Sequence, residues 1–492
     1  MIHRFFGGVH PKENKQATAG AATEALREPV GRVVLPMSMH VGPPCTPVVS
    51  VGDQVKVGQV IGEPTGLGAP IHASVSGRVA AVEPRPHTGG SPVMAVVIEN
   101  DGLDTQAEPL ERPVPPEKLT AEQVVELVRQ AGITGMGGAA FPTHVKLASA
   151  IGKVDTLILN GAECEPYITA DHRLMVEQPE KVLAGGRVLM RALGLNKFII
   201  GIEANKPDAV AALREKEPLR GGEVEVRALR VRYPQGSEKQ LIQNITGRRI
   251  PPGGLPASVG CAVFNVATAA AVWDAVAEGK PLTRRIVTVT GRGVLEPRNL
   301  WVPLGTPIET LIEACGGTRG APGRVLCGGP MMGVAQYDLT APIVKGSNAI
   351  LVLSRREYKK VPDTEPTCIR CGRCVQACPM RLTPLYIHQR VSAGRPEELE
   401  GLRILDCIEC GSCAFACPAH IPLVQSIRSG KAQVRKLQAE AKRDAEFKTA
   451  AQRAKEEAAA EGEKPSEKVP EEAEQARAET SEKTEKQEVK EP

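Results

Sequence analysis

The spacing of apolar residues changes along the 492-residue chain and predicts several kinds of structure. Between residues 30 and 100, short runs of alternating apolar and polar positions are typical of strands, and no helical period is present. The clearest runs are Thr46–Val51, Val55–Ile61, Gly77–Val82 and Val93–Ile98. The pattern predicts a small all-β unit.

A helix is predicted after the proline-rich linker at 105–118. Thr120 is a suitable N-cap, and Gln123 three residues later completes a capping box. The apolar residues of one helical face are Val124, Leu127 and Val128. We expect this helix to end before Gly132.

Strands and helices then alternate. Strands are predicted at Val154–Asn160, Lys197–Glu203 and Glu223–Val231. Helices are predicted at Glu180–Leu193, Pro207–Glu215 and roughly Asn265–Glu278, before Gly279. Alternation of this kind predicts an α/β domain with a mostly parallel sheet and right-handed crossovers.

The last third of the chain contains two further patterns. A strand at Arg285–Thr290, a hairpin, a second strand and a helix within about 35 residues predict a β-grasp module. Helices are predicted at Leu382–Val391 and Glu397–Leu405. From Lys431 onward the chain is mostly Ala, Glu, Lys and Arg, which predicts a solvated helix and then, beyond about residue 460, disorder.

Composition narrows the function. A net charge of +4 and an aromatic share of 3% do not provide the basic face or stacking surface of a nucleic-acid binder. No uninterrupted apolar stretch reaches the roughly 18 to 20 residues of a membrane span, and the N-terminus lacks the apolar core of a secretory signal. We therefore expect a cytosolic protein, or one bound to a membrane only through other proteins.

Eight of the thirteen cysteines lie between positions 368 and 417, in two copies of one pattern. The runs CIRCGRCVQACP and CIECGSCAFACP both match C-x2-C-x2-C-x3-C-P, the bacterial ferredoxin run. Clustered cysteines in a reducing compartment indicate metal ligation rather than disulfides. Two zinc sites are the alternative, but four-cysteine zinc sites usually pair two CxxC knuckles.

The spacing predicts which cysteines share a cluster. A tight turn at the glycine after the second cysteine lets three thiolates converge. The fourth cysteine, expected on the opening turn of a helix, points away and ligates the other [4Fe–4S] cluster. Cluster one is assigned to Cys368, Cys371, Cys374 and Cys417. Cluster two is assigned to Cys407, Cys410, Cys413 and Cys378. The other five cysteines are expected to be small buried residues, and no histidine is assigned to metal.

A glycine-rich loop, GMGGAAFPTHVK, occupies residues 135–146. Gly135, Gly137 and Ala140 have the spacing of a dinucleotide fingerprint, but that fingerprint must follow a strand, and this loop follows a predicted helix. What remains is a backbone loop able to approach a phosphate or an isoalloxazine ring closely, with Lys146 as a candidate phosphate partner.

This loop and the segment LILNGAECEP resemble the NADH- and FMN-binding flavoprotein of respiratory complex I. The resemblance implies that the FMN contacts are Gly135, Gly137, Gly138, Lys146 and Asn160. It implies that Phe141 stacks on the nicotinamide nucleotide and that Glu165 forms a hydrogen bond with it. Glu163 belongs to the same motif, and a solvated strand end is the alternative for both glutamates.

Two further stretches extend this resemblance. YPQGSEKQLIQNITGRRIPP places Gly236 and Glu238 in the family's pattern, with one residue inserted between them. Asn265 matches an asparagine of the family's NNVET segment, but Phe264 and Ala267 replace the first asparagine and the glutamate. We include Gly236, Glu238 and Asn265 among the candidate cofactor contacts.

The whole order of modules is similar to the RnfC/RsxC family, whose members belong to the ion-translocating ferredoxin:NAD oxidoreductase (Rnf) complex. The similarity begins at FGGVHPKENK and covers about residues 1–430. It includes a barrel resembling the lipoyl type, but without the modifiable lysine, so we expect a scaffold. The resemblance implies a translocase component that passes electrons between NAD(H), FMN and two [4Fe–4S] clusters. Its expected partners are the membrane subunits and ferredoxin or a cluster-bearing subunit, with no nucleic acid. Its expected place is peripheral, on the cytoplasmic side of the cell membrane.

We therefore expect a multidomain α/β protein in five parts. These are an N-terminal extension and lipoyl-like β-barrel (1–105), an FMN/NADH-binding α/β domain (119–280), an SLBB-like β-grasp module (284–355), an α-helical two-cluster ferredoxin domain (360–430) and a charged tail (431–492). Two alternatives stay open: a cobalamin reductase of the propanediol-utilisation type, against which the barrel argues, and a non-enzymatic electron wire without a nucleotide site.

Overall fold

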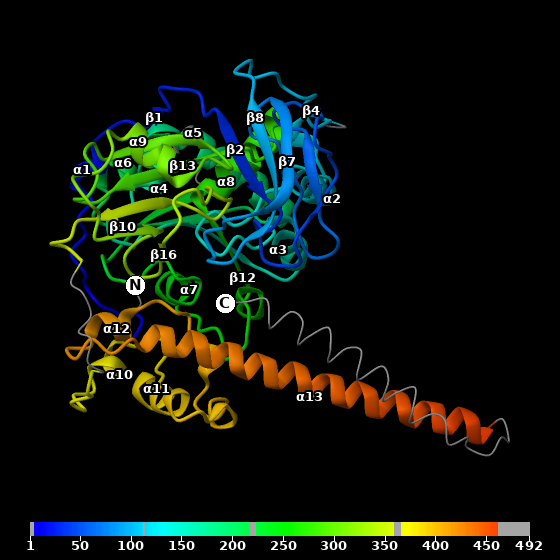
Figure 1. Ribbon diagram of the computed structural model, residues 1–492, viewed down its shortest axis with the longest axis vertical. Helices are drawn as coiled ribbons and strands as arrows, with labels where there is room; N and C mark the ends of the chain where they lie inside the picture. The colour runs from blue at the N-terminus through cyan, green and yellow to red at the C-terminus, as the bar shows by residue number, and fades with distance from the viewer. Residues whose placement is uncertain (1–3, 112–113, 217–222, 359–365, 461–492) are drawn as a thin grey trace.

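The computed structural model describes residues 4–111, 114–216, 223–358 and 366–460 (Figure 1). The disorder predicted beyond residue 460 lies outside these residues. In Figure 1 the cysteine-bearing helices lie beneath the rest of the molecule, and one long helix extends away from it. No helix in the described ranges is both long and apolar enough to cross a membrane.

The predicted all-β unit is present as two small antiparallel sheets. One has the order β2-β8-β7-β4, with β2 (Arg32–Pro36), β8 (Val93–Asn100), β7 (Gly77–Arg85) and β4 (Gln54–Val55). The other has the order β3-β5-β6, with β3 (Thr46–Pro47), β5 (Val60–Glu63) and β6 (Ile71–His72). Alternate residues such as Val33, Leu35, Val96 and Ile98 are fully buried, as the period of two requires.

The α/β domain has a four-stranded, fully parallel sheet in the order β11-β10-β9-β12. Its strands are β9 (Thr156–Gly161), β10 (Phe198–Glu203), β11 (Val224–Leu229) and β12 (Cys261–Asn265). The parallel sheet was predicted; β12 was missed because the same residues run directly into a helix. The chain moves outward from β9 to β11 and then returns to the other side of β9. The junction of β9 and β12 is therefore a topological switch point, where ligands of such sheets bind.

Seven α-helices of the described chain surround this sheet. They are α2 (Ala121–Gln130), α3 (Thr143–Ala150), α4 (Ala170–Glu177), α5 (Pro179–Ala192), α6 (Pro207–Lys216), α7 (Glu238–Thr246) and α8 (Val266–Glu278). The capping box of Thr120 and Gln123 is confirmed at the start of α2. Short 3-10 turns occur at Pro116–Lys118 and Pro256–Val259.

The β-grasp module is built on a six-stranded sheet in the order β1-β14-β13-β17-β15-β16. These strands are β1 (Glu24–Ala25), β13 (Arg284–Thr290), β14 (Arg298–Pro303), β15 (Arg324–Cys327), β16 (Val334–Gln336) and β17 (Ala349–Leu353). Helices α1 (Gln16–Ala19) and α9 (Ile308–Ala314) pack nearby. Because β1 precedes the barrel in the chain, the N-terminal extension joins the first module to the third.

The cysteine region contains α10 (Arg373–Ala377), α11 (Pro384–Ser392), α12 (Ser412–Ala416) and α13 (Leu423–Ala460). Helix α11 and the helix after Lys431 confirm two predictions. The helix predicted at Glu397–Leu405 was wrong: 3-10 turns at Pro396–Glu398 and Ile404–Asp406 replace it. The apolar spacing was misleading because the intervening chain contains Gly401 and turns at Arg403, whose φ is +57°.

One close helix contact gives a stability prediction. A Cβ on Gly185 of α5 would lie 1.8 Å from the carbonyl oxygen of Ala269 in α8. Gly185→Ala is therefore expected to lower the free energy of unfolding by roughly 1–3 kcal/mol, despite the better helix propensity of alanine. Gly66→Ala is the control, because no described atom lies within 4 Å of its Cβ position. Urea unfolding followed by circular dichroism measures both, and equal midpoints would contradict the expectation.

Candidate functional site

A cavity of about 650 Å³ lies where the modules meet. All four folded modules contribute to its wall. The barrel contributes residues 38–41 and 87–88, the α/β domain 137–140, 160, 163–165, 168, 171, 233–237 and 265, the β-grasp module 327–329, 332–334, 344 and 346–348, and the cysteine region 408 and 410. The cavity is therefore larger than the α/β domain alone defines.

Two asparagines mark the cavity at the carboxyl edge of the parallel sheet. Asn160 near the end of β9 and Asn265 at the end of β12 are paired in register, at the switch point. The amide of Asn160 donates to the Gly236 carbonyl (2.8 Å). Asn265 Oδ1 accepts from the Ala267 N–H (2.8 Å) at the start of α8, and its Nδ2 donates to Asp171 (2.6 Å). The structure thus brings two predicted residues, and the loop that carries Gly236, to one place.

The glycine-rich loop is closed by a hydrogen bond from the Gly135 N–H to the Phe141 carbonyl (2.8 Å). Within it, Gly138 has a φ of +131°, which favours glycine. A Cβ built on Gly138 would have no described atom within 4 Å, and one on Gly137 none closer than 3.5 Å. Both glycines line the cavity. Their bare backbone faces open space, which fits the close approach of a flavin or its phosphate.

Glu163 adopts a φ of +46° and is buried. Its carboxylate accepts hydrogen bonds from the N–H groups of Asp171 (2.7 Å) and His172 (3.2 Å) at the start of α4. It also forms an ion pair with Lys15 (3.8 Å). Burial raises the pKa of Glu163, and Lys15 opposes that rise. The side chain orders α4 and the N-terminal segment, so it is not a solvated strand end.

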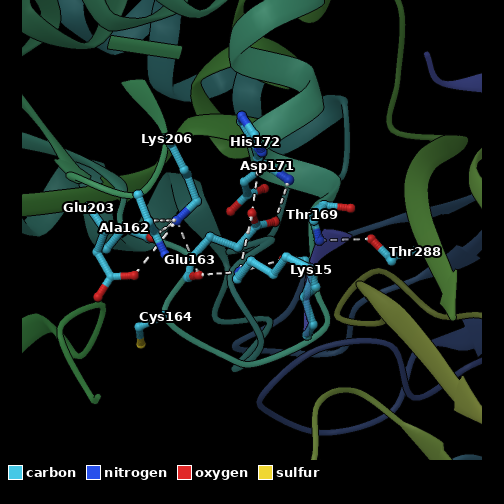
Figure 2. A network of polar contacts seen from close by, with 12 residues as sticks. Lys15, Ala162, Glu163, Cys164, Thr169, Asp171, His172, Glu203, Lys206 and Thr288 are labelled. Carbon is cyan, nitrogen blue, oxygen red and sulfur yellow. Dashed lines mark hydrogen bonds and ion pairs between the residues drawn. The ribbon is translucent and has the colours of Figure 1, made fainter. Parts of the chain in front are cut away.

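Two buried lysines fix the backbone around this glutamate (Figure 2). Lys15 Nζ donates to the carbonyls of Glu163 (2.8 Å) and Ile168 (2.5 Å). Lys206 Nζ donates to the Ala162 carbonyl (2.7 Å) and pairs with Glu203 (3.7 Å). Sequence reasoning missed both lysines, because a lysine in a polar segment usually faces solvent. The one available signal was the position of Lys15 at the end of FGGVHPKENK.

Glu165 also lies in the cavity wall. Tyr233 donates its hydroxyl to one carboxylate oxygen (3.3 Å), and the Met331 N–H donates to the other (3.2 Å). Burial raises the pKa of Glu165 to about 7, and these hydrogen bonds oppose the rise. The carboxylate is held by two modules, so the solvated alternative is excluded for Glu165 as well.

Four of the predicted contact residues are not among the described residues that line the cavity: Gly135, Phe141, Lys146 and Glu238. Lys146 on α3 forms an ion pair with Glu238, the first residue of α7, and lies 5.5 Å from the centroid of the Phe264 ring. The structure therefore brings Lys146 and Glu238 together. Their role, and the stacking role of Phe141, stay predictions.

Two buried cations behind the glycine-rich loop were not predicted. Arg285 in β13 donates to the carbonyls of Met136 (3.2 Å) and Lys345. Lys345 Nζ donates to the carbonyls of Pro70 (2.6 Å) and Gly132 (2.7 Å). Burial lowers the pKa of Lys345 to about 7 and that of Arg285 to about 10. These side chains tie the barrel, the glycine-rich loop and the β-grasp module to one another.

The cysteines form the two groups that were predicted. Cys368, Cys371, Cys374 and Cys417 line one pocket. Burial raises the pKa of Cys413 strongly, and the nearby thiols of the second group, Cys407, Cys410 and Cys378, raise it further. Within the described ranges no three His, Cys, Asp or Glu side chains converge on a single ion. A [4Fe–4S] core holds its thiolates farther apart than one ion does, and an all-cysteine donor set suits it.

The local geometry of the cysteine runs differs from expectation in one respect. Gly372 and Gly411 have φ values of +72° and +77° and begin the short helices, as predicted for the tight turn. The fourth cysteine was wrongly placed on an opening turn: Cys378 and Cys417 are the C-caps of α10 and α12. A proline follows each of them, and the residue before proline disfavours the helical conformation.

The two cysteine groups differ in exposure. Cys410 of the second group is buried and lines the main cavity, next to Ile408. Cys371 of the first group is exposed, and the neighbouring Ile369 is 66% exposed. The second group therefore adjoins the cavity, and the first reaches the protein surface. Of the remaining cysteines, Cys45, Cys261 and Cys315 are buried as predicted, whereas Cys164 and Cys327 line the cavity.

Four family models match the chain, in the predicted order. They are the RnfC barrel sandwich hybrid domain (residues 3–103), the Nuo51 FMN-binding domain (128–274), the SLBB domain (286–335) and the 4Fe-4S dicluster domain (360–421). These matches confirm the predicted fold class and the FMN and iron–sulfur cofactors.

Several curated proteins are similar over nearly the whole chain, and each is named as the same component of its complex. The component of the Na+-translocating ferredoxin:NAD+ oxidoreductase complex of Acetobacterium woodii is 47% identical over 433 residues, 87% of this chain and 97% of its own. The one from the proton-translocating ferredoxin:NAD+ oxidoreductase complex of Clostridium ljungdahlii is 46% identical over 78% of this chain and 83% of its own. The one from the ion-translocating oxidoreductase complex of Rhodobacter capsulatus is 44% identical over 87% and 82%.

Solved structures add a weaker likeness. An NAD+-reducing [NiFe]-hydrogenase aligns with 64% of this chain and 63% of its own, at 21% identity and a TM-score of 0.47.

Proposed function

The chain belongs to the RnfC family, whose curated members are subunits of ion-translocating ferredoxin:NAD+ oxidoreductase complexes, and from this premise we propose how it acts. It exchanges electrons between NAD(H), FMN and two [4Fe–4S] clusters, and the other subunits link this exchange to ion transport. The observation that carries the proposal is the cavity at the switch point of the parallel sheet, whose wall includes Cys410. One cavity adjoins both the FMN-binding domain and a cluster site.

The residues of the chain divide the work of binding. We propose that Gly135, Gly137, Gly138, Lys146, Asn160, Gly236, Glu238 and Asn265 bind FMN. Glu163 holds the loop that carries them, and Phe141 and Glu165 contact the nicotinamide nucleotide. FMN, when bound, supplies the exchange of electron pairs with NAD(H) and of single electrons with the clusters. The burial of Glu165 and Asn265 keeps water from the place of that exchange.

The positions of the cysteines suggest an order. Electrons leave the cavity at the site of Cys407, Cys410, Cys413 and Cys378, because Cys410 forms part of its wall. They reach the surface at the site of Cys368, Cys371, Cys374 and Cys417, because Cys371 is exposed. The exposed Arg370 and Arg373 beside Cys371 suit a partner with an acidic surface. That partner is ferredoxin or a cluster-bearing subunit of the complex.

The proposed place of the chain is peripheral, on the cytoplasmic side of the membrane, bound to the membrane subunits of an Rnf-type complex. The names of the relatives support a multi-subunit assembly. The barrel match distinguishes the chain from a cobalamin reductase that shares only the flavin and cluster modules.

An anaerobic NADH titration of the reconstituted full chain tests the proposal. The flavin absorbance should bleach first, followed by the broad visible absorbance of the clusters. A protein that binds no flavin and does not respond to NADH would be a one-electron wire, and the proposed exchange with NAD(H) would be wrong.

Glu165 gives a sharper prediction. Glu165→Gln keeps an oxygen for Tyr233 and Met331 but removes the charged acceptor for the nicotinamide nucleotide. A hydrogen bond to a charged group contributes about 1.5–3 kcal/mol, so the dissociation constant for NAD+ should rise about tenfold or more. Calorimetry measures this change. The exposed Glu309→Gln on α9 is the control and should bind as the parent does. Unchanged affinity in Glu165→Gln would remove Glu165 from the nucleotide site.

A further inference from the structure

The barrel forms part of the cavity wall, through the loop at 38–41 and the turn at 87–88. The FMN-binding domain match begins at residue 128 and does not include these residues. The loop is joined directly to the glycine-rich loop, because the Val41 N–H donates to the Ala140 carbonyl (3.2 Å). The barrel is therefore positioned to touch whatever the glycine-rich loop binds.

The His40 ring is a fixed part of this wall. It is 9% exposed, its Nε2 lies 3.3 Å from the Cys45 sulfur, and its Nδ1 lies 3.3 Å from the Val41 carbonyl. A Cβ on Gly68 would lie 2.7 Å from ring carbon Cε1. Burial lowers the pKa of His40, which keeps the ring neutral at pH 7. His40 therefore presents a rigid, uncharged aromatic edge or face to the cavity.

His87 carries a buried donor without an acceptor. The Gly89 N–H donates to His87 Nδ1 (3.0 Å), so Nδ1 is the acceptor and the proton of the neutral ring is on Nε2. This Nε2 is buried and has no hydrogen-bond partner among the described residues. Burial lowers the pKa of His87, and the Ser38 backbone opposes this without completing a hydrogen bond. A buried donor left unpaired costs about 1–3 kcal/mol, which an acceptor on a ligand would recover.

The turn that carries His87 is held in place by the β-grasp module. Gln336 in β16 donates to the Thr88 carbonyl (3.1 Å), and the Tyr337 hydroxyl donates to the Gly90 carbonyl (2.6 Å). The barrel wall is thus ordered before any ligand arrives, which lowers the entropic cost of binding.

We propose that this barrel wall binds the adenylate half of the nicotinamide dinucleotide, with His40 packing on the adenine and His87 Nε2–H donating to a ribose or phosphate oxygen. This inference rests on the proposed function. The sheet edge and glycine-rich loop take the flavin, and Glu165 takes the nicotinamide. The adenylate half then needs lining residues that these groups leave free. Phe141, expected to stack on the nucleotide, is not among the described lining residues, and the barrel provides the wall that remains.

Binding of ADP-ribose to the flavin- and cluster-loaded full chain tests this directly, because ADP-ribose lacks the nicotinamide. In calorimetry, His87→Ala should raise the dissociation constant of ADP-ribose about tenfold. His87→Gln, which can place an N–H near the position of Nε2, should recover most of that loss. His10→Ala is the matched control, since His10 is exposed and outside the described lining.

Kinetics with two donors separates the halves of the nucleotide. His87→Ala should raise KM about tenfold for NADH and leave KM for reduced nicotinamide mononucleotide unchanged, with kcat unchanged for both. An equal loss with both donors, or unchanged ADP-ribose binding, would overturn the inference while the parent protein still oxidises NADH. A parent protein that does not react with NADH at all would overturn the proposed function and this inference with it.

Discussion

Cys410→Ala is expected to separate NADH oxidation from onward electron transfer. Cys410 lies in the wall of the nucleotide cavity and belongs to the inner cysteine group. Without this ligand the inner cluster should be lost, and about half of the roughly eight iron atoms with it. NADH should still bleach the flavin, but reduction of an external one-electron acceptor should fall roughly 100-fold, because the route from the cavity to the surface is interrupted.

Cys371→Ala is the matched comparison, because it removes a ligand of the outer group instead. The iron content should again fall by about half, yet NADH should still reduce the inner cluster. Electron paramagnetic resonance of NADH-reduced samples distinguishes the two variants: a reduced-cluster signal is expected in Cys371→Ala and none in Cys410→Ala. The opposite assignment of these signals would reverse the proposed order of the two sites.

Local patterns made most of the fold predictable. The parallel sheet follows from apolar strands alternating with helices, and the capping box at Thr120 marked the start of α2. The error at Glu397–Leu405 has a local cause as well, since a favourable apolar spacing was interrupted by Gly401 and a left-handed Arg403. Strand β12 was missed because it passes into α8 without an intervening loop.

The candidate site was only partly predictable, because much of it is made of contacts between modules. Asn160, Glu165 and Asn265 occur in recognisable motifs, and the structure brings all three to one cavity. His40, His87 and Lys15 come from segments that carry no nucleotide-binding pattern. They reach the site through packing of the barrel and the N-terminal extension, which the order of residues alone does not specify.

The buried pair of Lys15 and Glu163 shows how strongly the site depends on the N-terminal extension. Lys15→Met keeps the length of the side chain but leaves the Glu163 carboxylate buried, and leaves the Glu163 and Ile168 carbonyls without this donor. Breaking a buried pair on one side typically costs about 3–5 kcal/mol. We expect a loss of that size in the free energy of unfolding, whereas Lys12→Met, at an exposed neighbouring position, should change it little.

The double variant Lys15→Met with Glu163→Gln should be more stable than Lys15→Met alone, because no unpaired carboxylate stays buried. The cost of Lys15→Met should also grow with pH. Burial raises the folded-state pKa of Glu163, so the folded state loses stability as pH rises from the unfolded pKa of about 4.3 to the folded one. Removing Lys15, whose charge lowers that pKa, extends the loss to higher pH.

Lys15 contributes a change of the same sign. Burial lowers its folded-state pKa, so the parent gains stability from this group as pH rises through that value toward the unfolded pKa, and the variant does not. Denaturant unfolding at pH 6 and pH 8 measures the difference. A cost that is larger at pH 6, or a double variant less stable than Lys15→Met, would show that Lys15 acts through its carbonyl hydrogen bonds rather than through the charge of Glu163.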